Sequence, residues 1–179
     1  MQRNNPTVDI IDNLPADTAN LQSPELLAGV TTMTRENITE LFGRRNLVFV
    51  ATLTKDGSPH VTPVWADMEG DLILINTSEA SAKAKHLSKD PRVGISLVEQ
   101  FNPYNMVTIK GRVVEMTSEG ADEHLHKLAK RYLGIGKYYY RKPKAKRVII
   151  KVKPEKVMGL SGHPAFYFLA YLPKDEKQE

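Results

Sequence analysis

Three short β-type segments joined by tight turns place the strongest constraint on what this chain can fold into. The segment LVFVATLT, residues 47–54, is rich in β-branched residues and leads into KDGS, a hairpin turn signal. The next segment, HVTPVWAD at residues 60–67, is followed by the turn residues EGD and then by LILINT at residues 72–77. Because parallel strands need a crossover of a dozen or more residues, connections this short predict an antiparallel meander.

Three further β-type segments follow, at residues 93–99, 106–117 and 147–157. The second of these is long, and we expect it to bend at Gly111. Six strands with only short helices between them favour a closed antiparallel barrel over a sandwich. The sequence therefore predicts a mainly β fold, namely a six-stranded antiparallel β-barrel.

Short helices are predicted around these strands. The first covers residues 35–45 with Thr34 as its N-cap, and the second covers about residues 80–88 before Pro91. The third is capped by Ser118, repeats apolar residues at helical spacing and ends at Gly134 or Gly136. The polar, aperiodic residues 1–33 are interpreted as an N-terminal extension or arm.

Composition and charge exclude several classes of protein. The hydrophobic fraction of 41% and the charged fraction of 26% are typical of a globular domain. With no cysteine, disulfides, thiolate catalysis and iron–sulfur clusters are excluded. No apolar run approaches the roughly 20 residues of a membrane span, and the N-terminus lacks a signal-peptide pattern, so we expect a cytoplasmic protein without a membrane partner.

The formal net charge of +4 is concentrated in a basic block at residues 137–156. Such a block fits nucleic acid, an acidic small molecule or plain solvent. It contains no recognisable RNA-binding motif, so a nucleic-acid partner is not favoured.

The stretch NTSEASAKAKHLSKDP, residues 76–91, places lysines in the first turns of the second predicted helix. A helix N-terminus carries positive partial charge, so lysines there need either solvation or a bound anion. Lys83 and Lys85 are two positions apart and therefore point about 200° from each other on a helix. One of them can face an anion while the other reaches a different group or solvent.

Nothing in the sequence predicts a catalytic acid, base or nucleophile. Motifs such as GxSxG, HExxH, GxGxxG and the P-loop are absent. His124 and His126 diverge on a helix and are interpreted as solvated, and the other histidines are isolated in sequence, so no metal site is predicted. Trp65 fits either core packing or the face of a planar ring, and Pro63 suits an edge strand. A reaction carried by a cofactor is the natural enzyme hypothesis.

The order of these motifs resembles the pyridoxamine 5′-phosphate oxidase-like split β-barrel family, especially its branch of F420-dependent reductases. The resemblance covers about residues 34–160 and is strongest in the turn ATLTKDGSP and the helix KAKHLSKDP. It implies a split-barrel domain at residues 34–160, followed by a C-terminal tail at residues 161–179. It also implies a homodimer that holds FMN or F420 in grooves between the subunits.

By this resemblance, the strand at residues 60–65 runs beside the flavin-type ring. The end of the next strand contacts the ring and the ribityl chain, and Lys83 binds the phosphate. The implied cofactor-binding residues are His60, Val61, Thr62, Pro63, Val64, Trp65, Ile75, Asn76, Thr77, Ser81, Lys83 and Lys85.

The activity implied by the resemblance is hydride transfer between F420 or FMN and a small organic substrate. A non-catalytic FMN- or F420-binding or storage protein is the alternative, and a nucleic-acid-binding barrel is less favoured. Ala82 stands where the pyridoxamine phosphate oxidases carry an arginine, so vitamin B6 oxidation is not implied.

Overall fold

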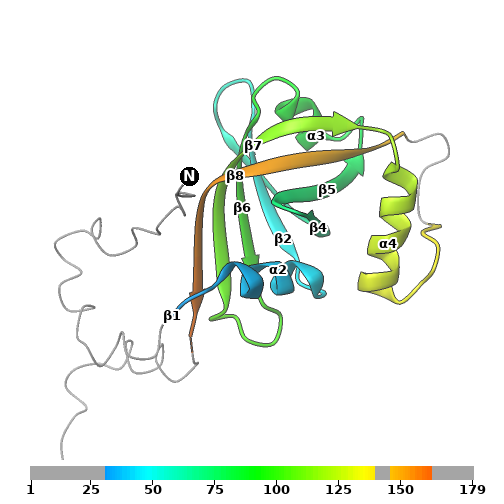
Figure 1. Cartoon of the computed structure of the whole chain (residues 1–179). Coiled ribbons are helices and arrows are strands. Elements are labelled where there is room, and N and C mark those ends of the chain that lie inside the picture. Colours follow the sequence, from blue (N-terminus) through cyan, green and yellow to red (C-terminus); the bar gives the residue numbers. More distant parts are fainter. Residues whose placement is uncertain (1–30, 140–145, 163–179) are drawn as a thin grey trace, which may run out of the picture.

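The computed structural model describes residues 31–139 and 146–162, which form one strongly curved antiparallel sheet with helices around it (Figure 1). The strands are β1 (Thr31–Thr32), β2 (Val48–Leu53), β3 (Pro59–Val64), β4 (Ala66–Glu69), β5 (Leu72–Ser78), β6 (Arg92–Val98), β7 (Met106–Thr117) and β8 (Arg147–Ser161). The helices are α2 (Arg35–Gly43), α3 (Ala82–Leu87) and α4 (Ala121–Leu133).

The two ends of the sheet are joined by the chain itself. Along the sheet the order is β3-β2-β6-β7-β8-β5-β4, and β1 pairs with β8 outside this path. β3 and β4 lie at opposite ends of this order, yet only Trp65 separates them in sequence. The chain therefore passes from one edge of the sheet to the other at Trp65, and this passage closes the barrel.

The predicted mainly β antiparallel fold is confirmed, but the predicted number of strands was wrong. The structure has eight strands in its described part rather than six. The segment at residues 60–67 forms two strands, because its first half pairs with β2 and its second half pairs with β5. The short strand β1 is the second strand that was not predicted, and it pairs with the end of β8.

The core lies inside the barrel and is closed at one end by α2. Phe42 of α2 and the strand residues Ile73, Ile75, Leu97 and Ile109 are at most 2% exposed. These large apolar side chains belong to one continuous cluster of buried residues. Their removal from water is the main source of stability of the barrel.

α4 packs on the outside of the barrel rather than within it (Figure 1). Its first residue, Ala121, joins a second apolar cluster with Leu74 of β5 and Ile149 of β8. None of the described helices is long and apolar enough to cross a membrane.

β7 and β8 curve together around the barrel (Figure 1), and Gly111 permits this curvature. The β7–β8 register shifts between Lys110 and Gly111. A Cβ atom at Gly111 would lie 2.9 Å from the backbone oxygen of Lys153, which is closer than real Cβ contacts come. The predicted bend at Gly111 is confirmed, and the physical reason is this close approach of two backbones.

Two of the three predicted helix caps agree with the structure, while α2 and α3 are each slightly shorter than predicted. Thr34 caps α2 through a reciprocal capping box with Asn37, as its position predicted. Gly134 ends α4 with a positive φ of 72°, also as predicted. The predicted cap at Ser118 was wrong: α4 begins after Gly120, whose φ of 64° belongs to a turn that Ser118 opens by accepting a bond from Ala121 N–H.

Candidate functional site

Three elements meet where β5 ends. Ser78, the last residue of β5, pairs with Arg147, the first residue of β8. Ser81 then caps α3 by accepting a hydrogen bond from Ala84 N–H at 3.3 Å. Thr77 Oγ1 donates to Ser81 Oγ at 3.1 Å, which fixes the position of both hydroxyls. The ends of two strands and the start of a helix therefore bring hydroxyl and cationic side chains together.

Lys83 and Lys85 point in different directions, as their spacing predicted. Lys83 is half-buried, whereas Lys85 is exposed. Burial lowers the pKa of Lys83, and the positive charge of Arg147 lowers it further. Within the described part of the chain, no carboxylate forms an ion pair with Lys83. The two side chains therefore repel each other electrostatically, and an anion in contact with Lys83 would offset this repulsion.

Arg147 is the residue of this cluster that the sequence did not reveal. Its Nε and one terminal nitrogen donate to Asn76 Oδ1 at 2.8 and 2.5 Å. In the sequence, Arg147 is one member of a long basic block, and nothing in that block distinguishes a site residue from a solvated one. Its pairing with Ser78 across the β5–β8 ladder is what brings it to Lys83.

Trp65 lies beside a groove at the β3–β4 break. Its ring stacks on that of Tyr132, with centroids 5.1 Å apart and an interplanar angle of 12°, and meets the Tyr138 ring edge-on. Trp65 is half-buried, so it neither fills the core nor stands free in solvent. The groove has a volume of about 960 Å³, and much of its lining is apolar or aromatic: Leu47, Phe49, Trp65, Val98, Phe101, Tyr132 and Leu133.

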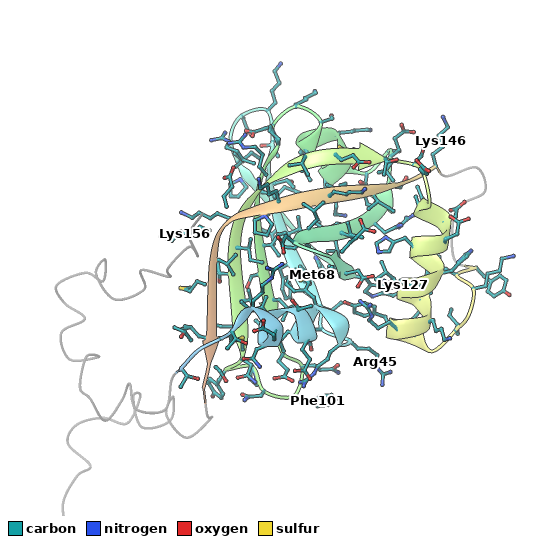
Figure 2. The ribbon with its side chains drawn as sticks, viewed as in Figure 1. Arg45, Met68, Phe101, Lys127, Lys146 and Lys156 are labelled. Carbon is teal, nitrogen blue, oxygen red and sulfur yellow. The ribbon has the colours of Figure 1, made fainter. Side chains whose placement is uncertain are left out.

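The outer rim of this groove is formed by the chain after α2 and by the β6–β7 loop. Figure 2 shows two of its residues, Arg45 and Phe101, at the end of the barrel that α2 covers. Phe101 is 90% exposed, and Leu47 and Phe49 are also partly exposed. This is an apolar surface on the described part of the chain, and such a surface marks a place of contact with a ligand or another protein.

Polar contacts from α4 hold the chain on both sides of the β3–β4 break. Arg131 donates to the carbonyls of Phe42 and Ala66 and to Asp67 Oδ1, the last at 2.8 Å. Lys127, on the side of α4 that faces the barrel, forms a close ion pair with Asp67 Oδ2 (Figure 2). Tyr132 donates from its hydroxyl to Asn46 O at 2.7 Å. α4 therefore fixes the position at which the chain passes from β3, at one edge of the sheet, to β4, at the other edge.

Asp67 itself is only 4% exposed. Burial raises the pKa of this carboxyl, but His124, Lys127 and Arg131 together outweigh burial and hold the pKa well below its usual range. The prediction that His124 is solvated was wrong: it is 8% exposed and its Nε2 lies 3.8 Å from Asp67 Oδ2. His126 is half-buried and accepts a hydrogen bond from Tyr138 N–H, so it is not a simple surface residue either.

The predicted residues of β3 occupy mixed environments. Pro63 lies on the edge strand β3, opposite Phe49, as expected for a residue that cannot donate to a ladder. Val61 is exposed, Val64 packs against the core, and the buried hydroxyl of Thr62 has no hydrogen-bond partner among the described residues. The His60 ring meets the His86 ring edge-on at 5.4 Å, so two histidines that are distant in sequence lie together.

The structure therefore brings some of the predicted site residues together and separates others. Thr77, Ser81 and Lys83 form one cluster, and Asn76 joins it through Arg147. Ile75 is fully buried in the core. In the described part of the chain, no group of three or more potential metal ligands is found.

We call Thr77, Ser81, Lys83 and Arg147 the cationic cluster. Trp65 lies close to this cluster in the sheet. Trp65 directly precedes Ala66, whose partner across the β4–β5 ladder is Ile75. The cationic cluster begins two residues further along β5. At about 3.3 Å per strand residue, an elongated ligand can reach both Trp65 and the cluster.

Several solved structures are similar to this chain in fold. A solved structure described as an F420 reductase is 25% identical, with a TM-score of 0.58, covering 66% of this chain and 93% of that one. A conserved hypothetical protein from Mycobacterium tuberculosis is 25% identical, with a TM-score of 0.57, covering 73% and 85%. A FAD-binding protein from Mesorhizobium loti is 18% identical, with a TM-score of 0.56, covering 75% and 99%.

Curated protein sequences give no match to this chain. The family model for pyridoxamine 5′-phosphate oxidase matches residues 34–161. This match includes every strand from β2 to β8 and each residue of the cationic cluster. The chain belongs to the pyridoxamine 5′-phosphate oxidase family.

Proposed function

We propose that this chain binds a flavin-type cofactor, F420 or FMN, and that it transfers hydride between this cofactor and a small organic substrate. The observation that carries the proposal is the placement of Lys83 beside Arg147 with no carboxylate in contact with Lys83 among the described residues. Two neighbouring cations repel each other, so a phosphate that contacts both would replace repulsion with charge-assisted hydrogen bonds. The 25% identical F420 reductase supports a cofactor of this class.

The residues present fit such a cofactor. Lys83, Arg147 and the hydroxyls of Thr77 and Ser81 would hold its phosphate. α3 has six residues, so its dipole adds little and the two cations supply most of the attraction. Trp65 and the apolar groove beside it would orient the ring and exclude water. When bound, a flavin-type ring itself carries the hydride chemistry, so the protein needs only to bind, orient and shield.

Of the two cofactors, we expect F420 to bind more tightly than FMN at near-physiological salt. F420 carries a phospholactyl and polyglutamate tail, and the basic block at residues 137–156 has the complementary charge. Residues 140–145 of this block lie outside the described residues. Exposed charges are screened beyond roughly 8 Å at this salt, so the preference for F420 should narrow as the salt concentration rises.

The proposal is tested by replacing Lys83 with alanine and measuring the affinity for FMN and F420 by fluorescence titration. We expect a loss of about 1.5–3 kcal/mol, the range of a hydrogen bond to a charged group, which is about 10- to 150-fold in affinity. Lys85→Ala is the matched control: it removes the same charge from the same helix, but from an exposed side chain.

Two outcomes would count against the proposal. If Lys83→Ala binds both cofactors as tightly as the parent protein, Lys83 does not contact the phosphate. If the parent protein binds neither cofactor, the assignment to this cofactor class fails altogether. Binding without any reduction or oxidation of the cofactor by candidate substrates would instead support the alternative of a binding or storage protein.

We further propose that the active species is a homodimer whose interface includes the apolar groove. Support comes from Leu47, Phe49 and Phe101, which leave apolar surface exposed in a single chain. Sedimentation at micromolar concentration should therefore give a dimer. Phe101→Ser should weaken it without unfolding the chain, because Phe101 is 90% exposed. A monomer that still binds the cofactor would contradict this part of the proposal.

A further inference from the structure

The sequence after β8 contains an uncharged aromatic stretch that the proposed site does not use. Residues 164–172 read PAFYFLAYL, with two phenylalanines, two tyrosines, two leucines and no charged residue. They lie outside the described residues. The residues that follow Pro173, KDEKQE, are all polar or charged. Contact of so apolar a stretch with water is unfavourable, so an apolar surface within its reach would stabilise it.

The described part of the chain ends beside such a surface, the apolar groove. Asn102 of the β6–β7 loop donates from its Nδ2 to the carbonyl oxygen of Gly162 at 3.1 Å. Ser161 Oγ donates to Asn105 Oδ1 of the same loop at 2.9 Å. Phe101, which directly precedes Asn102, lines the groove and is 90% exposed (Figure 2). The chain therefore leaves Gly162 next to the Phe101 rim of the groove.

The charges around the groove favour an uncharged occupant. Of the three arginines that line it, Arg44 forms a close ion pair with Glu99, and Arg131 pairs with Asp67 at 2.8 Å. An anionic ligand would compete with these carboxylates, whereas an apolar segment leaves both ion pairs in place. Besides Phe101, three apolar lining residues are 41–48% exposed: Leu47, Phe49 and Leu133.

We propose that residues 164–172 dock in the apolar groove of their own chain and cover it beside Trp65. In sequence, only His163 separates this stretch from Gly162. A connection this short gives an effective concentration on the order of mM, so the same chain is favoured over a free partner. At about 3.3 Å per residue, the stretch can extend up to about 30 Å, so its length does not limit contact with the groove.

The size of the groove indicates how much of the stretch it can hold. Its volume of about 960 Å³ is that of a site for a drug-sized ligand, about 300–1,000 Å³, so it takes a few side chains rather than the whole stretch. In the homodimer proposed above, the second subunit would pack on a groove that already contains these side chains. The inference goes beyond the proposed function, because it assigns the groove an occupant other than the cofactor.

The protein carries its own reporter for this test. Trp65 lines the groove and is the only tryptophan in the sequence, so its fluorescence is recorded without added cofactor. The variant replaces both Phe166 and Phe168 with serine in the full chain. The matched control replaces Lys174 and Lys177 with serine, two residues of the same tail beyond the apolar stretch. Circular dichroism verifies that both variants are folded.

We expect the emission of Trp65 to shift to longer wavelength in the phenylalanine variant and to stay unchanged in the control. Since a tryptophan buries about 150–250 Å² in a protein, loss of part of its cover should raise its acrylamide quenching constant about twofold. Binding of the dye ANS should also increase, because the groove is then open to it. A chain that ends at Gly162 should behave in the same way, and it decides the question if the phenylalanine variant is not folded.

The groove side of the contact is tested with Phe101→Ser. In the parent protein it should increase quenching, and in the phenylalanine variant it should add nothing further, because the two sides of one contact are not additive. Emission, quenching and dye binding that match the parent in both tail variants would overturn the inference. If dilution of the parent to a monomer exposes Trp65 while the tail variants do not, a second copy covers the groove instead, which overturns the inference and supports the homodimer. None of these measurements uses a cofactor, so their failure leaves the proposed function standing.

Discussion

Replacing Arg131 with alanine is expected to destabilise the fold more than replacing any exposed arginine of the barrel. The side chain of Arg131 is 19% exposed, and it is held at the break between β3 and β4. It donates to two backbone carbonyls, those of Phe42 and Ala66, and to Asp67. The substitution therefore leaves a buried carboxylate with one fewer cation and two carbonyls with one fewer donor.

The size of the expected loss of stability follows from the partners that Asp67 keeps after the substitution. Removing one partner of a buried ion pair costs about 3–5 kcal/mol, because the other charge is left in a poorly solvated place. Asp67 keeps Lys127, whose side chain is 60% exposed, so the carboxylate is not left alone. We therefore expect the lower end of the range, about 3 kcal/mol, which is a large share of the about 5–15 kcal/mol that holds a domain folded.

Urea unfolding followed by far-ultraviolet circular dichroism measures this effect. At a typical slope of about 2 kcal/mol per molar urea, a loss of 3 kcal/mol lowers the midpoint by about 1.5 M. Arg112→Ala is the matched control, because Arg112 pairs with Glu155 at 3.1 Å while both side chains are about half exposed. Surface pairs of this kind contribute below about 1 kcal/mol, so its midpoint should fall by less than about 0.5 M.

Arg131→Lys provides an intermediate case. It keeps a cation near Asp67 but loses the planar fork that reaches two carbonyls as well, so its midpoint should fall between those of the parent and Arg131→Ala. The reasoning is refuted if Arg131→Ala unfolds at the same urea concentration as Arg112→Ala. It is also refuted if Arg131→Lys is as unstable as Arg131→Ala, because the retained positive charge would then contribute nothing to stability.

Three other predictions concern the same fold. The pKa of Asp67 is depressed in the folded state. The ionised carboxylate therefore stabilises the fold above the unfolded pKa of about 3.9, and this stabilisation is lost as the pH falls below that value. Between pH 5 and pH 3, the urea midpoint of Asp67→Asn should therefore decline less than that of the parent protein. Gly111→Ala should cost about 1–3 kcal/mol by backbone overlap, whereas Gly136→Ala, with open space around it, should be nearly neutral in thermal unfolding. Tyr132→Phe should lose about 1–2 kcal/mol in the same assay, since it removes a hydroxyl that donates to the Asn46 carbonyl and accepts a long hydrogen bond from Ala66 N–H.

Local chemistry made much of the fold predictable from sequence. The turn at residues 55–58, the cap at Thr34 and the end of α4 at Gly134 depend on residues that are neighbours in the chain. The divergence of Lys83 and Lys85 follows from helical geometry alone. Gly111 could be recognised because a glycine inside a long strand pattern commonly marks a bulge.

The break at Trp65 could not be predicted in the same way. The residues of β3 and β4 form one β-type pattern, in which Pro63 indicates an edge strand but does not show that the chain changes partner at Trp65. The break depends instead on which strands are available as partners, β2 for the first half and β5 for the second. Pairing choices of this kind are decided by the closed sheet as a whole.

The same limit explains the two misjudged side chains. His124 belongs to a helix with mixed polarity, and its burial comes from Asp67 of β4. Arg147 has lysines on both sides of it in the basic block, and its position is fixed by a hydrogen bond to Asn76 of β5. In both residues the partner is more than fifty positions away, and no periodicity within one element carries that information.

α4 links the stability of the barrel to the geometry of the proposed site. Its first residue, Ala121, anchors Asn76 and through it Arg147, and Tyr132 near its other end stacks on Trp65. Residues 121 to 132 of a helix span about 16 Å at 1.5 Å per residue. α4 therefore contacts residues at both ends of the proposed site, Asn76 through Ala121 and Trp65 through Tyr132. Arg131, next to Tyr132, joins this helix to the strand break, so loosening the Arg131 contacts should disturb the Trp65 end of the site before it disturbs the cationic cluster.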